Sequence, residues 1–188
     1  MLLKFLSNSD KLHLVELAKL LALADKPLLW DGKTTDEFTS DTDLSELSIQ
    51  EGEQERELIA ELEQSVDSRS IYNPFSSHGD VADRLIEVLK TFPIPKAEKP
   101  ATRVQAATTV LKELLKDKKF ELLSTPKVIL FELLLVALRD GNISSIEWAL
   151  LKEFQVHHQL EDFIFDDLLE RAETLSQEVS KTISIILE

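Results

Sequence analysis

Two carboxylates flank a glycine turn in the second half of the chain. Asp140 ends an apolar run and is followed directly by Gly141. Ser144 and Glu147 then form the Ser-x-x-Glu pattern that begins many helices. Two carboxylates that face each other across such a turn repel unless a cation or a proton lies between them. Because both side chains offer oxygen ligands, Asp140 and Glu147 are candidate ligands of Ca²⁺ or Mg²⁺.

A purely structural interpretation of the same turn remains open. The Glu147 carboxylate can accept a hydrogen bond from the Ser144 amide, as in a capping box, and Asp140 can fix the turn. In that interpretation the two carboxylates shape the backbone, and neither of them needs a metal ion.

A second, less regular copy of this pattern lies in the first half of the chain. Asp25 also ends an apolar run, and after a polar insertion Ser48-Ile49-Gln50-Glu51 repeats the Ser-x-x-Glu order. Two units of helix, acidic turn and helix in one chain predict an internal duplication. Asp25 and Glu51 are therefore the first-half candidates for the same kind of divalent cation.

Other residue patterns that carry chemistry are weak or absent. The sequence has no cysteine, no Gly-x-Ser-x-Gly motif, no phosphate-binding glycine loop and no His-Glu-x-x-His motif. His157 and His158 follow Glu153 by about one helical turn, but a third ligand is missing, so we expect a surface pair. We therefore predict a protein without enzymatic activity. A hydrolase that uses two carboxylates with different pKa values is the remote alternative.

The spacing of apolar residues predicts an all-α fold, a compact bundle of about seven helices. Nowhere does a sustained alternation of polar and apolar residues suggest hairpins. We expect one domain, residues 1–188, with a first half (1–92), a proline-rich extended connector (92–100) and a second half (101–188). The predicted helices span residues 8–25, 48–65, 79–91, 102–117, 126–139, 144–158 and 161–186.

An acidic insertion, residues 26–47, separates the two helices of the first copy. It is too long for a simple turn between helices. Trp30 and Phe38 either dock on the protein's own core, which is the favoured interpretation, or offer an apolar patch to a partner. Asp41 and Asp43 resemble the start of an EF-hand loop, but Glu46 stands at its glycine position. The candidate partner-binding residues are Trp30, Asp41, Asp43 and Glu46.

The net charge of −14 is distributed unevenly. Residues 25–67 carry fourteen acidic and three basic side chains, and residues 140–188 carry eleven and three. Residues 84–119 reverse this balance, with four acidic and nine basic side chains. The acidic total argues against nucleic acid as a partner and favours another protein. The basic block is either a solvated helix face or a contact for an acidic partner or for anionic lipid headgroups.

The chain is expected to lack a membrane span, because its longest apolar run, Val128–Leu138, contains Glu132 and is too short to cross a bilayer. The absence of cysteine is compatible with the reducing cytoplasm, which is the expected location. The sequence leaves the oligomeric state open.

The acidic turns resemble those of the TerB-like tellurite-resistance proteins. Their signature is a duplicated helix that ends in Ala-Asp-Gly, followed by a short turn and a Ser-x-x-Glu helix start. Residues 135–147 of this chain fit that signature closely, whereas in the first copy Lys26 replaces the glycine after Asp25. The resemblance implies an all-helical, cytoplasmic bacterial protein of the stress response, without known catalytic activity. It also implies that the acidic turns bind a divalent metal.

Overall fold

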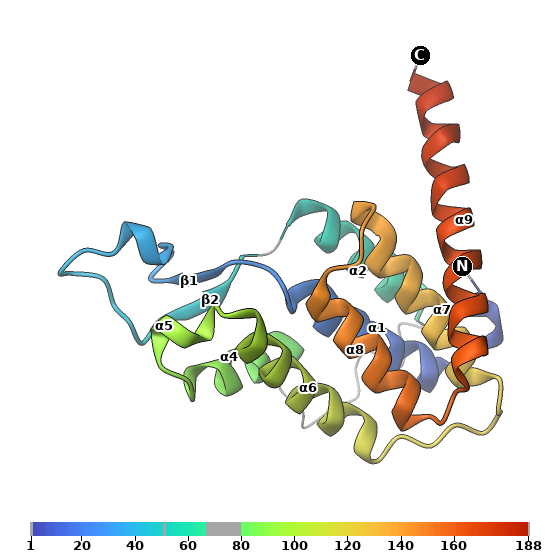
Figure 1. Cartoon of the computed structure of the whole chain (residues 1–188), viewed down its shortest axis with the longest axis horizontal. Helices are drawn as coiled ribbons and strands as arrows, with labels where there is room; N and C mark the ends of the chain where they lie inside the picture. Colours follow the sequence, from blue (N-terminus) through green and yellow to red (C-terminus); the bar gives the residue numbers. More distant parts are fainter. Residues whose placement is uncertain (1, 51, 67–79, 188) are drawn as a thin grey trace.

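The computed structural model describes residues 2–50, 52–66 and 80–187, and helices hold most of them (Figure 1). The predicted all-α class is confirmed, whereas the internal duplication remains a prediction. The α-helices are α1 (Asn8–Leu23), α2 (Glu53–Gln64), α4 (Val81–Lys90), α5 (Ile94–Ala97), α6 (Pro100–Lys116), α7 (Thr125–Ala137), α8 (Ser145–His157) and α9 (Asp162–Leu187). Within these described residues, the short 3₁₀ helices are η1 (Leu3–Phe5), η2 (Thr35–Glu37) and η3 (Leu138–Asp140).

Helix α1 forms the centre of the bundle. It is apolar on nearly every side, and it packs against α2, α4, α6 and α7. A helix with this composition is stable only when other elements cover it all round. The buried side chains of both halves of the chain form one continuous cluster, which runs from Leu6 to Ala172. The core therefore ties the first copy of the acidic pattern to the second.

The second half of the chain packs around α7. Helix α8 lies along α6, and α9 lies along α7 and η3. The N-terminal part of α9 is held in this way, and its C-terminal part extends past the body of the molecule (Figure 1). Within the described ranges, no helix combines the length and the apolar composition that crossing a bilayer requires.

The acidic insertion forms a protruding hairpin, which the sequence did not predict. Strands β1 (Leu28–Trp30) and β2 (Leu47–Ile49) pair in antiparallel fashion, with Leu29 opposite Ser48. We call residues 28–49 the arm, and Figure 1 shows it extending from the side of the molecule. The predicted helix 48–65 is therefore wrong at its start, since residues 47–49 belong to the sheet and α2 begins after Gly52. Short strands give too few positions for a visible alternation.

The proline-rich connector and the first Ser-x-x-Glu pattern both differ from what the sequence predicts. The connector 92–100 is not extended throughout, because it contains α5, in whose first turn Pro95 is tolerated and whose Ala97 is buried. The Ser-x-x-Glu pattern of the first copy does not begin a helix, because Ser48 lies in β2. Glu51, the predicted first-half metal ligand, lies outside the described residues.

Candidate functional site: the acidic turn and its lysine

The turn between α7 and α8 has the backbone that its sequence predicts. Helix η3 ends at Asp140, and Gly141 adopts a left-handed conformation with φ of +85°. Such an angle favours glycine because a Cβ atom strains it. The Ser144 amide donates to Glu147 Oε2 at 2.7 Å, and the Glu147 amide donates to Ser144 Oγ at 3.2 Å. The capping box is therefore confirmed, and Glu147 has the structural role that the sequence predicts.

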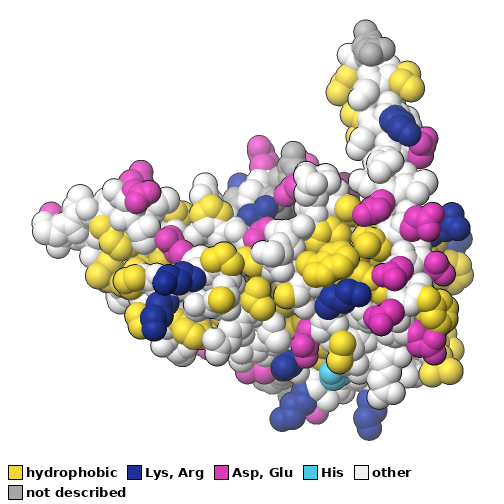
Figure 2. Space-filling view, viewed as in Figure 1, with side chains coloured by type: hydrophobic (Ala, Val, Ile, Leu, Met, Phe, Trp, Pro, Cys, Tyr) yellow, Lys and Arg dark blue, Asp and Glu magenta, His cyan; other side chains and the backbone are white. Residues whose placement is uncertain are grey.

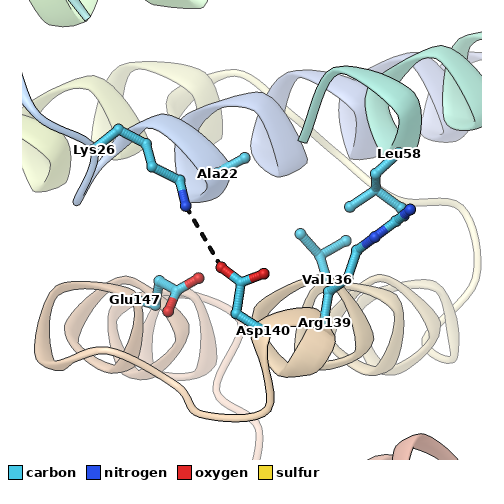
Figure 3. Close-up of a pocket in the computed structure, with 7 residues that line it drawn as sticks. All are labelled: Ala22, Lys26, Leu58, Val136, Arg139, Asp140 and Glu147. Atoms are coloured by element: carbon cyan, nitrogen blue, oxygen red, sulfur yellow. Dashed lines mark ion pairs between the residues drawn. The ribbon is translucent and has the colours of Figure 1, made fainter. Parts of the chain in front are cut away.

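Lys26 supplies the positive charge at this turn. Its ammonium Nζ lies 3.5 Å from Asp140 Oδ2. Figure 3 shows Asp140 and Glu147 on one side of a small pocket and Lys26 reaching toward them from the end of α1. Lys26 occupies the position after Asp25 where the pattern has glycine. The same lysine places a positive charge beside Asp140 of the second copy.

The pKa of Glu147 also depends on Asp25, the first-half candidate ligand. Burial raises the pKa of Glu147 to about 7, and the negative charge of Asp25 adds to this increase. The Ser144 amide and the Lys26 ammonium act in the opposite direction. Two of the predicted metal ligands from different halves are therefore electrostatically coupled. A proton on Glu147 near neutral pH relieves part of their repulsion.

The pocket beside these groups is small. The space open to the centre of a water molecule is about 20 Å³, enough for one water molecule or one small ion. In the part of the chain that the structure describes, no group of three or more His, Cys, Asp or Glu side chains is arranged to hold a metal ion. The structure nevertheless places Asp25, Asp140 and Glu147 in one neighbourhood, together with Lys26. The residues that line the pocket are Ala22, Lys26, Leu58, Val136, Arg139, Asp140 and Glu147.

A buried arginine, which the sequence analysis missed, supports the same neighbourhood. Arg103 on α6 is only 3% exposed. Its Nε donates to Ala24 O at 2.9 Å, and its Nη2 donates to Ala24 O at 2.7 Å and to Leu23 O at 3.0 Å. These carbonyl groups end α1, where cationic donors are favourable. Burial lowers the pKa of Arg103, while the charge of Asp25 opposes that decrease. The available signal was an arginine on the face of α6 that also carries Ala107 and Val110, both buried.

The arm presents its acidic residues to solvent, whereas Trp30 is buried and Phe38 is partly buried. Trp30 is 2% exposed and meets Phe38 edge to face, with the ring centroids 5.7 Å apart. The expectation that Trp30 docks on the core is confirmed, and Trp30 is not available as the partner-binding residue that we also considered. Asp41, Asp43 and Glu46 are all exposed. They remain candidates for binding a partner.

The histidine pair at the C-terminal end of α8 is exposed only in part. His157 is exposed, whereas Nε2 of His158 is buried without a hydrogen-bond partner. The His158 ring packs against Phe154 and Phe120, and Phe120 also contacts the buried His13. Burial, with the nearby His157 and His13, lowers the pKa of His158 to about 4. The expectation of a surface pair is therefore wrong for His158, which belongs to an aromatic cluster.

Comparison with known proteins adds no relative: no family model, no curated protein and no solved structure matches the chain. The resemblance to the TerB-like proteins accordingly rests on the residues of the two acidic turns. Membership of that family, and a link to tellurite or stress, remain predictions.

Proposed function

We propose that this chain is a non-enzymatic protein-binding module whose arm presents an acidic surface to a basic partner. The observation that carries the proposal is the charge of residues 31–46, where six acidic side chains accompany a single basic one, Lys33. Lys33 lies 3.8 Å from Asp31 and so offsets only part of that charge. The acidic residues, all exposed, are Asp31, Asp36, Glu37, Asp41, Asp43 and Glu46.

Internal hydrogen bonds hold the arm in one shape. The Thr34 amide donates to Glu37 Oε2 at 3.0 Å and closes a capping box at η2. The Ser45 amide donates to Asp43 Oδ1 at 2.9 Å, and the Ser45 hydroxyl donates to the same atom at 2.6 Å. A loop that is ordered before binding loses less conformational entropy when a partner docks. This order supports a recognition role for the arm.

A divalent-cation role at the acidic turn is the second candidate. The coupling of Asp25 to Glu147 favours it, because an added cation relieves that repulsion. Such an ion has to compete with Lys26, whose ammonium already lies beside Asp140. Lys26 directly precedes Pro27 and β1, so displacement of its side chain is a physical route from the turn to the arm. A Ca²⁺ or Mg²⁺ ion that displaced Lys26 in this way would act as a modulator of the arm.

The test of the arm uses a lysine-rich peptide as a probe of basic surfaces. The variant combines Asp41→Asn, Asp43→Asn and Glu46→Gln, which removes charge and keeps hydrogen-bonding side chains. The control combines Asp166→Asn, Asp167→Asn and Glu170→Gln, three exposed acidic residues of α9. Both variants change the net charge equally, so only the position of the charge differs.

We expect the arm variant to slow association of the peptide, whereas the control keeps most of the wild-type rate. The rate for the wild type should fall steeply with added salt, because exposed charges more than about 8 Å apart are screened at physiological ionic strength. Stopped-flow fluorescence of a labelled peptide measures both effects. Equal rates for the arm variant and the control would show that the arm has no special role.

A further inference from the structure

A cavity much larger than the pocket at the acidic turn lies between helices of the first half of the chain. Helices α2 and α4 both pack against α1, and the cavity is lined by residues of α1, of α2 and of the N-terminal end of α4. The space open to the centres of water molecules is about 330 Å³. Pockets that bind small molecules begin at about 300 Å³. This cavity is therefore large enough for a small organic ligand.

Small apolar side chains form the walls of the cavity. Ala22, Ala60 and Ala82 contribute from α1, α2 and α4, together with Leu23 and Ile59. Alanine at these positions leaves space that larger side chains would fill in a closely packed core. Ala60 is exposed, so the cavity is open to solvent on the side of α2. The walls thus suit the apolar body of a ligand that enters from solvent.

Four charged residues lie at the cavity, and three of them have their charge offset. Lys19 Nζ lies 2.8 Å from Glu63 Oε1, so these two charges offset each other. Asp80 directly precedes α4, where the positive end of the helix dipole partly offsets a carboxylate. The fourth residue is Arg56 of α2, which is exposed. Among the described residues, its guanidinium has no ion-pair or hydrogen-bond partner.

The lack of a carboxylate partner for Arg56 contrasts with the acidity of the chain. The net charge is −14, and Figure 2 shows acidic side chains over the arm and along α9. A guanidinium binds a carboxylate through two parallel N–H···O bonds, a geometry that lysine cannot match. Arg56 is therefore available to a carboxylate from outside the chain.

The geometry of α2 sets the length of a ligand that fits. Arg56 and Glu63 are seven residues apart, which separates them by about 10 Å along the helix. Ile59 and Ala60 lie between them on the same face. The cavity thus has a cationic group at one end of an apolar wall and the neutralised Lys19–Glu63 pair at the other.

We propose that this cavity binds a small organic carboxylate with an apolar body, of the arylalkanoate class. The carboxylate accepts two hydrogen bonds from Arg56, and the apolar body lies along Ile59 and Ala60. The cavity is separate from the arm, so binding of this ligand does not depend on the function proposed for the arm.

The other charges at the cavity disfavour two alternative ligand classes. A phosphate ester carries up to two negative charges near neutral pH, and Asp80 and Glu63 disfavour the second. An organic cation has to compete with Lys19 for Glu63 and is repelled by Arg56. A single negative charge is the best match for one guanidinium.

The test compares three probes that share one apolar body. Phenylbutyrate carries a carboxylate, phenylbutanol carries no charge, and phenylbutylamine carries a positive charge. Each is titrated into the isotope-labelled full-length chain, and the NMR shifts of the amides of Ala22, Ala60 and Ala82 report binding in the cavity. We expect saturable shifts at all three amides, with a dissociation constant of about 0.1–1 mM for phenylbutyrate. The other two probes should bind at least about fivefold more weakly, because they lose the charged bonds to Arg56.

Two variants and a control assign the binding to named residues. Arg56→Gln removes the charge, and it should bind phenylbutyrate no more tightly than phenylbutanol. Arg171→Gln, at an exposed arginine of α9, changes the net charge equally and should bind as the wild type does. Ala60→Trp fills the cavity from its solvent side, and it should weaken binding of both probes without disturbing the core.

Several results would overturn the proposal. A preference for phenylbutyrate that survives in Arg56→Gln would exclude the arginine as the anchor. Tighter binding of phenylbutylamine would assign the cavity to cations, through Asp80 and Glu63. Unchanged affinity in Ala60→Trp would place the probes elsewhere on the protein. The absence of saturable shifts at the three alanine amides with every probe would exclude the cavity as a binding site.

Discussion

The ammonium of Lys26 lies 3.5 Å from the carboxylate of Asp140, at the turn where the sequence predicts a Ca²⁺ or Mg²⁺ ion. A lysine next to a carboxylate does electrostatically what a bound cation does, without any need for an ion from solution. An external cation can therefore bind only if it displaces the Lys26 side chain or binds beside it. The choice between a structural turn and a cation site depends on Lys26.

The first prediction concerns removal of this lysine. In the wild type we expect the same melting temperature with chelator, with Ca²⁺ and with Mg²⁺. Lys26→Gln leaves Asp140 and Glu147 without the ammonium, and this variant should gain a rise in melting temperature with added Ca²⁺. Lys19→Gln on α1 is the matched control and should show no response. A melting temperature of the wild type that rises with Ca²⁺ would favour the cation role instead.

Asp140→Asn should have little effect on stability. The ion pair with Lys26 is partly exposed, with Asp140 54% exposed, and such pairs contribute little after screening by solvent. Asparagine also suits the turn. We expect a change below about 0.5 kcal/mol in the free energy of unfolding, measured by urea denaturation. A loss of several kcal/mol would reveal a larger electrostatic role for this carboxylate.

Glu147→Gln should change how stability depends on pH. The pKa of Glu147 is about 7 in the folded chain, against an ordinary value of 4.5, so the folded state holds its proton more tightly. Wild-type stability from this group is therefore complete below pH 4.5 and is lost as the pH rises to about 7. Glutamine keeps an acceptor for the Ser144 amide and cannot ionise. The free energy of unfolding of the variant minus that of the wild type should therefore be about 1–3 kcal/mol higher at pH 8 than at pH 4.

His158→Gln should show the opposite slope. The pKa of His158 is about 4 in the folded chain, against an ordinary 6.5, so the unfolded state binds the proton more tightly. Stability from the neutral ring is present above pH 6.5 and is lost as the pH falls toward 4. The free energy of unfolding of the variant minus that of the wild type should therefore be about 1–2 kcal/mol higher at pH 5 than at pH 8. His157→Gln, at the exposed neighbour, is the control, and an equal gain there would contradict the assignment to His158.

Arg103→Lys should be strongly destabilising although it conserves the charge. Lysine has one nitrogen, so it cannot reproduce the fork that reaches both Leu23 O and Ala24 O. We expect a loss of about 2–4 kcal/mol in the free energy of unfolding. Arg139→Lys, on the surface near the same turn, is the control and should change stability little. A small loss for Arg103→Lys would mean that water or the ammonium satisfies the carbonyl groups.

The sequence predicts the helices well where one face is regularly apolar. Helix α6 begins and ends within two residues of its predicted range, 102–117, and the Ser144 and Glu147 capping box marks the start of α8 correctly. In both cases the signal is local, since side-chain spacing or a bond across three residues defines the element. Ser48 fails by the same rule, because pairing with β1 prevails over its capping pattern.

The candidate site could be predicted only in part. Asp140 and Glu147 lie close together because a short turn joins them, and the sequence contains that turn. The contribution of Lys26 and Arg103 depends on the packing of α1 against the second half of the chain, which spacing along the sequence does not reveal. Tertiary contacts between distant segments bring the positive charges of Lys26 and Arg103 to the site.

The central position of α1 has a consequence for biosynthesis. Helices α1 and α7 pack together, although about a hundred residues separate them in the chain. Contacts between such distant segments slow folding, because a long loop must close before they form. While α7 is still inside the ribosome, the leucines that α1 buries against it have no cover. The nascent N-terminal half is therefore the stage at which this protein should depend most on a chaperone.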